Sequence, residues 1–227
     1  CITALVKLLG SASVGVQRSA AGALCNLAGG NAASKAVIAA EPGCLTALVK
    51  LLDSASVGVQ EAAAGALRRL AAVTAVIAAE PGCLTALVKL LGSASVGVQE
   101  AAAGALCSLA AGNSANQAAI AAESGCITAL VKLLGSASVG VQRSAAGALC
   151  NLAGGNAASK AVIAAEPGCL TALVKLLDSA SVGVQEAAAG ALRRLAAVTA
   201  VIAAEPGCLT ALVKLLGSAS VGVQEAA

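Results

Sequence analysis

Residues 2–28 read ITALVKLLGSASVGVQRSAAGALCNLA, and versions of this stretch recur along the whole chain. Counted from Thr3, the TALVKLL segment returns after 43, 39, 43, 43 and 39 residues, at Thr46, Thr85, Thr128, Thr171 and Thr210. Residues 1–102 and 126–227 are identical. Self-similarity at this period indicates a solenoid, in which each repeat packs on its neighbours. The sequence therefore predicts an all-α solenoid.

Each full repeat contains three helical segments. The first, NAASKAVIAAEPG (31–43), opens on an asparagine suited to an N-cap and stops at Pro-Gly. The second starts at Ile2 and is ended by Gly10. The third follows Ser13, a good N-cap residue, and runs to about Ala28.

We interpret residues 1–227 as one solenoid, with units at 1–43, 44–82, 83–125, 126–168, 169–207 and, in part, 208–227. Both ends fall inside a repeat and no specialised end cap is recognisable, so we expect a piece of a longer array. The two 39-residue units, 44–82 and 169–207, depart from this pattern, because their LAAVTAVIAAEPG lacks four residues against LAGGNAASKAVIAAEPG. We expect the following first helix to be shortened there, with a local change of superhelical twist. Natural duplication, design and an assembly artefact remain open as origins of the identity.

The order ITALVKLL, VQRSAAGALCNLA and a closing glycine resembles the armadillo repeat, and the resemblance covers the whole chain. HEAT repeats are the structural neighbour, but they have two helices and lack this order. The resemblance implies a right-handed superhelix in which the third helices form a concave wall that holds a protein or an extended peptide. It also fits a protein-binding scaffold more than an enzyme.

Composition narrows the function further. The chain is 59% hydrophobic and 11% charged, has a net charge of +3, and contains no Phe, Trp, Tyr, Met or His. No long Lys/Arg run is present, which argues against a nucleic-acid partner. Without His or Tyr, and without a GxxxxGK[ST] loop, the sequence offers no catalytic site, and we expect no enzyme activity and no cofactor.

The nine cysteines recur at equivalent positions of the repeats, with no CxxC motif and no histidine beside them. We interpret them as small buried apolar residues rather than disulfides or metal ligands, in a reducing compartment. This predicts an intracellular protein, cytoplasmic or nuclear, with no metal site. Residues 101–122 are uncharged and long enough to cross a bilayer, but Gly112 and the polar residues that follow it interrupt the stretch, so we expect no membrane span.

The faces of the third helix separate a core from an open surface. At 100° per residue, a stripe of about 100° contains Val16, Ala20, Ala23, Leu24 and Leu27. The remaining arc is small or polar throughout, and holds Gly15, Ser19, Gly22, Asn26 and Gly29. Glycine costs about 1 kcal/mol inside a helix relative to alanine, so Gly22 requires a reason, either an open ligand face or close helix packing.

The armadillo resemblance places a peptide-binding asparagine at Asn26. An amide offers a donor and an acceptor together, which suits a peptide main chain. We therefore predict a peptide-binding concave face made of Ser19, Gly22, Asn26, Gly65, Arg69, Gly104, Ser108, Ser144, Gly147, Asn151, Gly190 and Arg194. Family members that hold nuclear-localisation peptides often carry tryptophan one turn before the asparagine. Glycine stands there in every repeat, which disfavours a nuclear-import adaptor.

Arginine replaces the asparagine at Arg69 and Arg194. Exposed arginines favour carboxylate or phosphate groups, so an acidic or phosphorylated extended segment is the preferred ligand class. The alternative is that Arg69 pairs with Glu61 or Glu100. For the whole protein, the alternatives are a substrate-recruiting segment of a larger enzyme, such as a ubiquitin ligase, and a spacer between other domains. We also expect the uncapped ends to self-associate.

Overall fold

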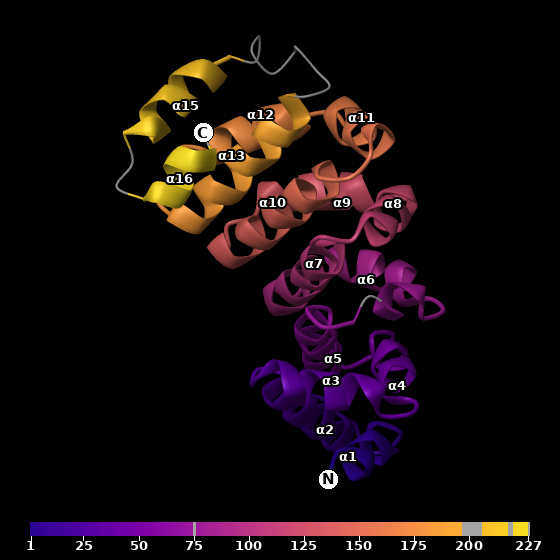
Figure 1. Cartoon of the computed structure of the whole chain (residues 1–227). Helices are drawn as coiled ribbons and strands as arrows, with labels where there is room; N and C mark the ends of the chain where they lie inside the picture. The colour runs from indigo at the N-terminus through magenta and orange to yellow at the C-terminus, as the bar shows by residue number, and fades with distance from the viewer. Residues whose placement is uncertain (75, 197–205, 218–219, 227) are drawn as a thin grey trace. The chain divides into compact units, whose positions relative to one another are not determined.

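The computed structural model describes residues 1–74, 76–196, 206–217 and 220–226, and every regular element in these ranges is helical (Figure 1). The all-α prediction is therefore confirmed. Contacts divide the chain into two compact units, Cys1–Leu109 and Ala110–Ala227. Each unit is described by itself.

The first unit begins with the second helix of a repeat. Its elements are α1 (Ile2–Leu9), α2 (Val14–Leu27), α3 (Ala32–Ala40), α4 (Cys44–Leu51), α5 (Val57–Leu70), the 3₁₀ helix η1 (Val76–Ala79), α6 (Cys83–Leu91) and α7 (Val96–Ala110). The second unit contains α8 (Ser114–Ala122), α9 (Cys126–Leu134), α10 (Val139–Ala153), α11 (Ala157–Ala165), α12 (Cys169–Leu176), α13 (Val182–Ala196), α15 (Cys208–Leu216) and α16 (Val221–Ala226).

The helix ends lie close to their predicted places. Asn31 caps α3, since its side-chain oxygen accepts a hydrogen bond from the Ser34 N–H at 2.8 Å. Gly43 then takes a φ of 73°, a left-handed conformation that lets the chain turn from α3 into α4. Ser13 does precede α2, but its hydroxyl makes no capping bond. The N–H of Ser13 is instead bonded to the Ser11 hydroxyl at 3.1 Å.

The four-residue deletion has the predicted local effect. The 39-residue unit 44–82 lacks these four residues. In it only η1 remains, where the neighbouring repeats have nine-residue helices such as α3 and α8. The equivalent segment of the second copy, 197–205, lies outside the described residues. The change of superhelical twist stays a prediction.

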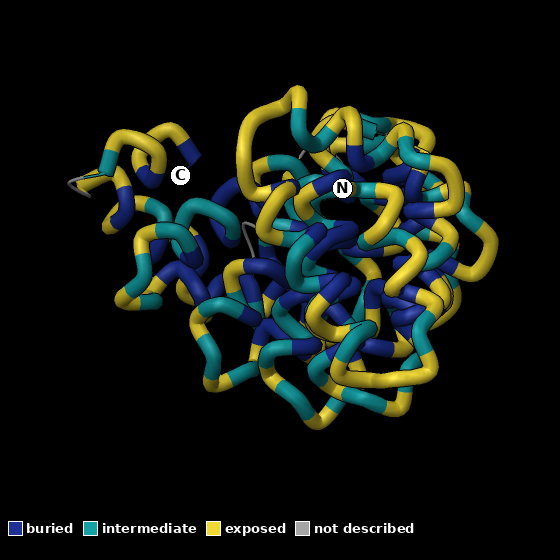
Figure 2. The backbone as a smooth tube through the Cα atoms, turned by 90° about the horizontal axis from the view of Figure 1, so that it is seen from below, coloured by how far each residue is buried: buried dark blue, intermediate teal, exposed yellow. Residues whose placement is uncertain are grey.

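The predicted core stripe is confirmed in the inner repeats. In α5 its members are fully buried, namely Val59, Ala63, Ala66, Leu67 and Leu70. In α2, however, Leu27 is 43% exposed although Leu24 is fully buried. The cause is position: α2 is the first long helix of the chain, so no preceding repeat covers that end of its stripe. Buried stretches and exposed turns alternate along the chain (Figure 2).

The long helices pack side by side, and glycine is what lets them approach. In the first unit α2 lies along α5, and in the second α10 lies along α13. The Cys25 Sγ lies 3.3 Å from where a Gly65 Cβ would be, and the Cys150 Sγ lies 3.1 Å from that of Gly190. Each glycine therefore receives a side chain from the preceding repeat. At Gly22, by contrast, nothing lies within 4 Å.

The prediction of buried cysteines is confirmed for five of the six that open second helices, whereas Cys1 is exposed; the three inside the long helices, Cys25, Cys107 and Cys150, are half-buried. The five fully buried side chains are those of Cys44, Cys83, Cys126, Cys169 and Cys208. Burial, with a smaller contribution from the adjacent glutamate, raises the pKa of the Cys44 thiol to about 11 and that of Cys83 to about 12. These thiols stay protonated and apolar at neutral pH, as the sequence interpretation required.

Candidate functional site

An open groove crosses the polar faces of the long helices in the first unit. Its hollow has a volume of about 550 Å³ and lies over α2, α5 and α7. These three helices are labelled in Figure 1. Its lining includes glycine, polar and charged residues, among them Arg18, Gly22, Asn26, Glu61, Gly65 and Arg68. Small residues keep the floor shallow, while charged side chains rise from it. This groove is the candidate peptide site.

The predicted site residues fall into three groups. Those that are exposed are Ser19, Asn26 and Arg69. Those that are half-buried are Gly22, Gly65, Ser108, Gly147, Asn151 and Arg194. Those that are buried are Gly104, Ser144 and Gly190. Ser144 is only 5% exposed, so its hydroxyl is not offered to a ligand as predicted. Its exposed counterpart Ser19 lies on the first long helix of the chain.

The two arginines at the asparagine position contact the preceding repeat. The Arg69 Nη1 donates a hydrogen bond to the Cys25 carbonyl at 2.7 Å, and the Arg194 Nη1 donates one to the Cys150 carbonyl at 2.8 Å. Both carbonyls lie in the last turn of a long helix, whose negative dipole end favours a cation. Among the described residues, Arg69 forms no ion pair with either glutamate, so the alternative pairing with Glu61 or Glu100 is wrong.

A glycine at the end of the preceding long helix makes room for each guanidinium. A Cβ on Gly29 would lie 2.5 Å from the Arg69 Nη1, and one on Gly154 would lie 2.6 Å from the Arg194 Nη1. The sequence carried a signal for this contact. The long helices that precede Arg69 and Arg194 are followed by glycine at this position, Gly29 and Gly154. The equivalent residue before the repeat with Ser108 is Ala72.

Three charged side chains of the groove lie over the next repeat. A Cβ on Gly58 would lie 2.9 Å from the Arg18 side chain, one on Gly97 would lie 2.6 Å from the Glu61 carboxylate, and one on Gly104 would lie 2.8 Å from the Arg68 side chain. Glu100 lines the groove as well. Within the part of the chain that the structure describes, Arg18, Glu61, Arg68 and Glu100 have no ion-pair partner within 4 Å. Their charges are available to a ligand.

Sequence reasoning missed Arg18, Glu61 and Arg68 as groove residues. It assigned the ligand arginine to Arg69, one residue after Arg68, from the family position alone. The helical period could have found them, since Glu61, Gly65 and Arg68 recur at three- and four-residue steps along one face of α5.

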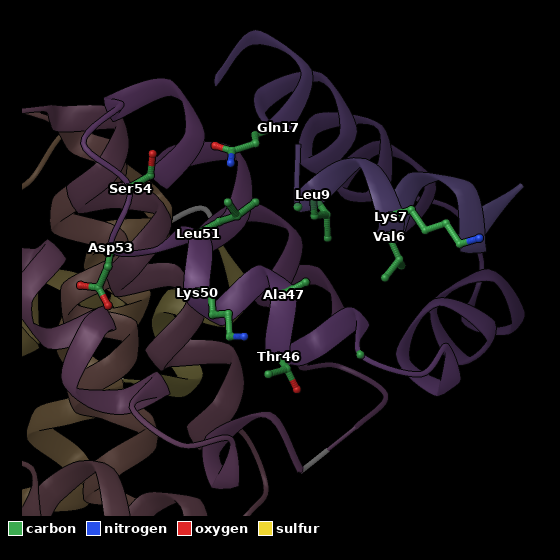
Figure 3. Close-up of a pocket in the computed structure, with 12 residues that line it drawn as sticks. Val6, Lys7, Leu9, Gln17, Thr46, Ala47, Lys50, Leu51, Asp53 and Ser54 are labelled. Carbon is green, nitrogen blue, oxygen red and sulfur yellow. The ribbon is translucent and has the colours of Figure 1, made fainter. Parts of the chain in front are cut away.

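A second hollow, of about 650 Å³, lies between α1 and α4 (Figure 3). Its polar groups are already engaged or point elsewhere. The Gln17 amide donates to the Ser11 carbonyl at 2.8 Å, and Asp53 pairs with Lys89 at 3.1 Å. Figure 3 shows the Lys7 side chain extending away from Lys50. The hollow recurs between α9 and α12, at about 560 Å³, because the two copies are identical. It is a gap between consecutive second helices rather than a formed site.

Metal ligation and membrane insertion are two further functions that the arrangement of side chains and helices bears on. Within the described ranges, no group of three or more His, Cys, Asp or Glu side chains could hold a metal ion. No single helix in those ranges is long and apolar enough to span a membrane. Three pairs of short helices meet the length and composition of a span only when taken together, and each pair is bent by 86–90° at its break.

Stacked three-helix repeats with a groove along their third helices define a helical-repeat scaffold. The model of the Armadillo/beta-catenin-like repeat matches residues 1–29, 32–72, 75–111, 113–154 and 157–197. The chain belongs to the armadillo repeat family, and the predicted resemblance is confirmed. The internal matches open near the first helix of each repeat, one helix before the cysteines from which we counted the units.

Engineered and designed proteins are among the similar solved structures. An engineered protein is 37% identical with a TM-score of 0.89, covering 99% of this chain and 92% of its own. The designed armadillo repeat protein YIII(Dq)4CqI is 35% identical with a TM-score of 0.89, covering 100% and 96%. Another designed armadillo repeat protein, solved in complex with the peptide (KR)4, is 34% identical with a TM-score of 0.85, covering 99% and 95%. No match was found among curated proteins.

Proposed function

We propose that the chain is a non-enzymatic scaffold that holds an extended peptide segment in the groove over α2, α5 and α7. The observation that carries the proposal is the groove itself, a continuous hollow in which the exposed Asn26 amide and unpaired charges surround a glycine floor. A designed relative was solved with a bound peptide, which supports the same class of partner. The partner is a protein or peptide inside the cell, in the cytoplasm or the nucleus.

For the ligand we propose acidic or phosphorylated side chains. Arg69 uses Nη1 on the Cys25 carbonyl, yet it remains exposed and a guanidinium has five N–H donors. The bond to α2 holds the group in one place, so less side-chain entropy is lost when a carboxylate or phosphate binds. The adjacent Arg68 adds a second cation, which lines the groove itself.

A basic peptide is the competing ligand class, and two observations favour it. Glu61 and Glu100 line the same groove, and a designed relative binds the peptide (KR)4. The groove therefore carries charges that suit both acidic and basic peptides, and a binding experiment distinguishes the two ligand classes.

The test is a set of extended peptides of equal length and different charge, titrated against the whole chain. The Arg69→Ala/Arg194→Ala variant is compared with Lys7→Ala/Lys132→Ala, which removes the same charge from the second helices. We expect acidic or phosphorylated peptides to bind the chain and the lysine variant equally, and the arginine variant about tenfold more weakly.

Basic peptides that bind the arginine variant as tightly as the parent chain would refute the acidic preference. Failure of every peptide to bind would refute the scaffold proposal and leave a spacer as the better account.

A further inference from the structure

We infer that the groove of the first unit selects an extended segment in which basic and acidic side chains alternate. The inference rests on the proposed function and refines the ligand class. It follows from a juxtaposition over α5 and α7, where Glu61 and Glu100 lie on one edge and Arg68 on the other, across a floor of small residues. On α2 the position of Glu61 is taken by Arg18, which lines the same hollow, so the acidic edge begins at α5.

The two edges lie on opposite ends of one helix face. Glu61 and Arg68 are seven residues apart on α5, which returns to the same face after about two turns. At about 1.5 Å per residue their backbone positions lie about 10 Å apart along the helix. Gly65, with no side chain, lies between them and leaves room for a backbone to cross.

The acidic edge continues onto the next helix. Glu100 occupies on α7 the position that Glu61 has on α5, and both carboxylates line the same hollow. The Glu61 carboxylate reaches over Gly97 at the start of α7, so the acidic edge extends from one helix to the other. Cys107 and Ser108 take the places of the two arginines on α7, and Arg69 donates to the Cys25 carbonyl, so Arg68 is the cation of the opposite edge on α5 and α7.

An extended peptide that crosses the helices matches this arrangement. Its successive side chains point to opposite sides, so alternate residues meet opposite edges. Two residues advance about 7 Å, against about 8–10 Å between neighbouring helix axes, and long basic side chains span the difference. A ligand of uniform charge would place half of its side chains against an edge of the same sign.

In the second unit, the counterparts of Glu61 and Arg68 make hydrogen bonds of their own. In the second unit, the Ser220 hydroxyl donates to the Glu186 carboxylate at 3.0 Å, and the Arg193 Nη1 donates to the Glu225 carbonyl at 3.3 Å. The corresponding Glu61 and Arg68 have no such partners among the described residues. A background chain with Arg143→Gln, Glu186→Gln, Arg193→Gln and Glu225→Gln therefore removes the second-unit counterparts of Arg18, Glu61, Arg68 and Glu100.

The experiment compares four peptides of about twelve residues, a length of about 40 Å when extended. One alternates lysine and glutamate, one has the same composition in two blocks, one is all lysine and one is all glutamate. Each is titrated by calorimetry against the background chain at low salt. We expect the alternating peptide to bind at least about tenfold more tightly than the block isomer and both uniform peptides.

Two groove variants and two matched controls show which side chains cause the tighter binding of the alternating peptide. Glu61→Gln/Glu100→Gln and Arg68→Gln should each weaken the alternating peptide about tenfold. Glu41→Gln, at the end of α3, and Lys7→Gln, on α1, should leave it unchanged. Equal binding of the block isomer, or tighter binding of a uniform peptide, would overturn the inference while the scaffold function stands. Absence of binding by all four peptides would overturn both.

Discussion

Replacing Gly29 and Gly154 by alanine tests whether the arginines fasten neighbouring repeats. The new Cβ atoms would lie 2.5 and 2.6 Å from Nη1 of Arg69 and Arg194. Since real Cβ atoms do not approach other atoms so closely, each guanidinium must leave the carbonyl to which it donates, at 2.7 Å for Cys25 and 2.8 Å for Cys150.

The size of the effect follows from the contact that is lost. A hydrogen bond to a charged group contributes about 1.5–3 kcal/mol, and a cation at a helix C-terminus about 0.3–1 kcal/mol. Arg69 is exposed and Arg194 half-buried, so water recovers much of this, and we expect about 1 kcal/mol per site. The two sites lie in different units and should add to about 2 kcal/mol.

Urea unfolding followed by circular dichroism is the suitable assay, because the chain has no aromatic residue to report by fluorescence. With a urea dependence of about 2 kcal/mol per molar, the midpoint should fall by about 1 M. Each alanine Cβ would also lie 3.0 Å from a carbonyl of its own helix, that of Asn26 or Asn151. A cycle with Arg69→Ala/Arg194→Ala separates this strain from the lost arginine contact.

In the Arg69→Ala/Arg194→Ala background, the glycine substitutions should lower the free energy of unfolding by less than about 0.5 kcal/mol. If they cost the full 2 kcal/mol there, strain against the helix carbonyls is the cause and the fastening role of the arginines is refuted. An unchanged midpoint in the glycine variant would refute it as well.

Two further outcomes follow from the helix caps and the buried thiols. Asn31→Ala together with Asn156→Ala removes two N-caps whose side chains accept at 2.8 Å, and should lower the unfolding free energy by about 1 kcal/mol per site in urea titrations. Lys35→Ala, on the same helix, is its control. Burial raises the pKa of Cys83, Cys126 and Cys169 from 9.0 to about 12, so folding favours the protonated thiols. Stability should therefore be full below pH 9 and decline as the pH rises toward 12. A chain with alanine at these three positions should lose this part of the decline, and an equal decline in both chains would contradict the prediction.

Repeat spacing and helical period were sufficient to predict most of the local structure. Asn31 caps the first helix, the core stripe of α5 is buried, and the shortened linker leaves only the 3₁₀ turn η1. Each of these features depends on residues within one repeat, where sequence separation fixes which side chains share a face. The armadillo family could be recognised for the same reason.

The candidate site could be predicted only in part. Asn26 and Gly22 do line the groove, and Asn26 is exposed as expected. Ser144 is buried, and the Arg69 side chain turns back to the preceding repeat while Arg68 lies in the groove. One residue of difference along α5 thus separates the arginine that lines the groove from the one that donates to the preceding repeat, and a position in a repeat pattern does not contain this difference.

The sequence by itself therefore determined that the chain is a stack of armadillo repeats, where each helix starts and ends, and which stripe is apolar. Only the tertiary structure decided which glycine receives which neighbouring side chain, and hence which charges remain for a ligand. The physical reason is that these contacts cross from one repeat to the next. They depend on the offset and rotation between adjacent long helices, which side-chain packing sets and a repeat period does not.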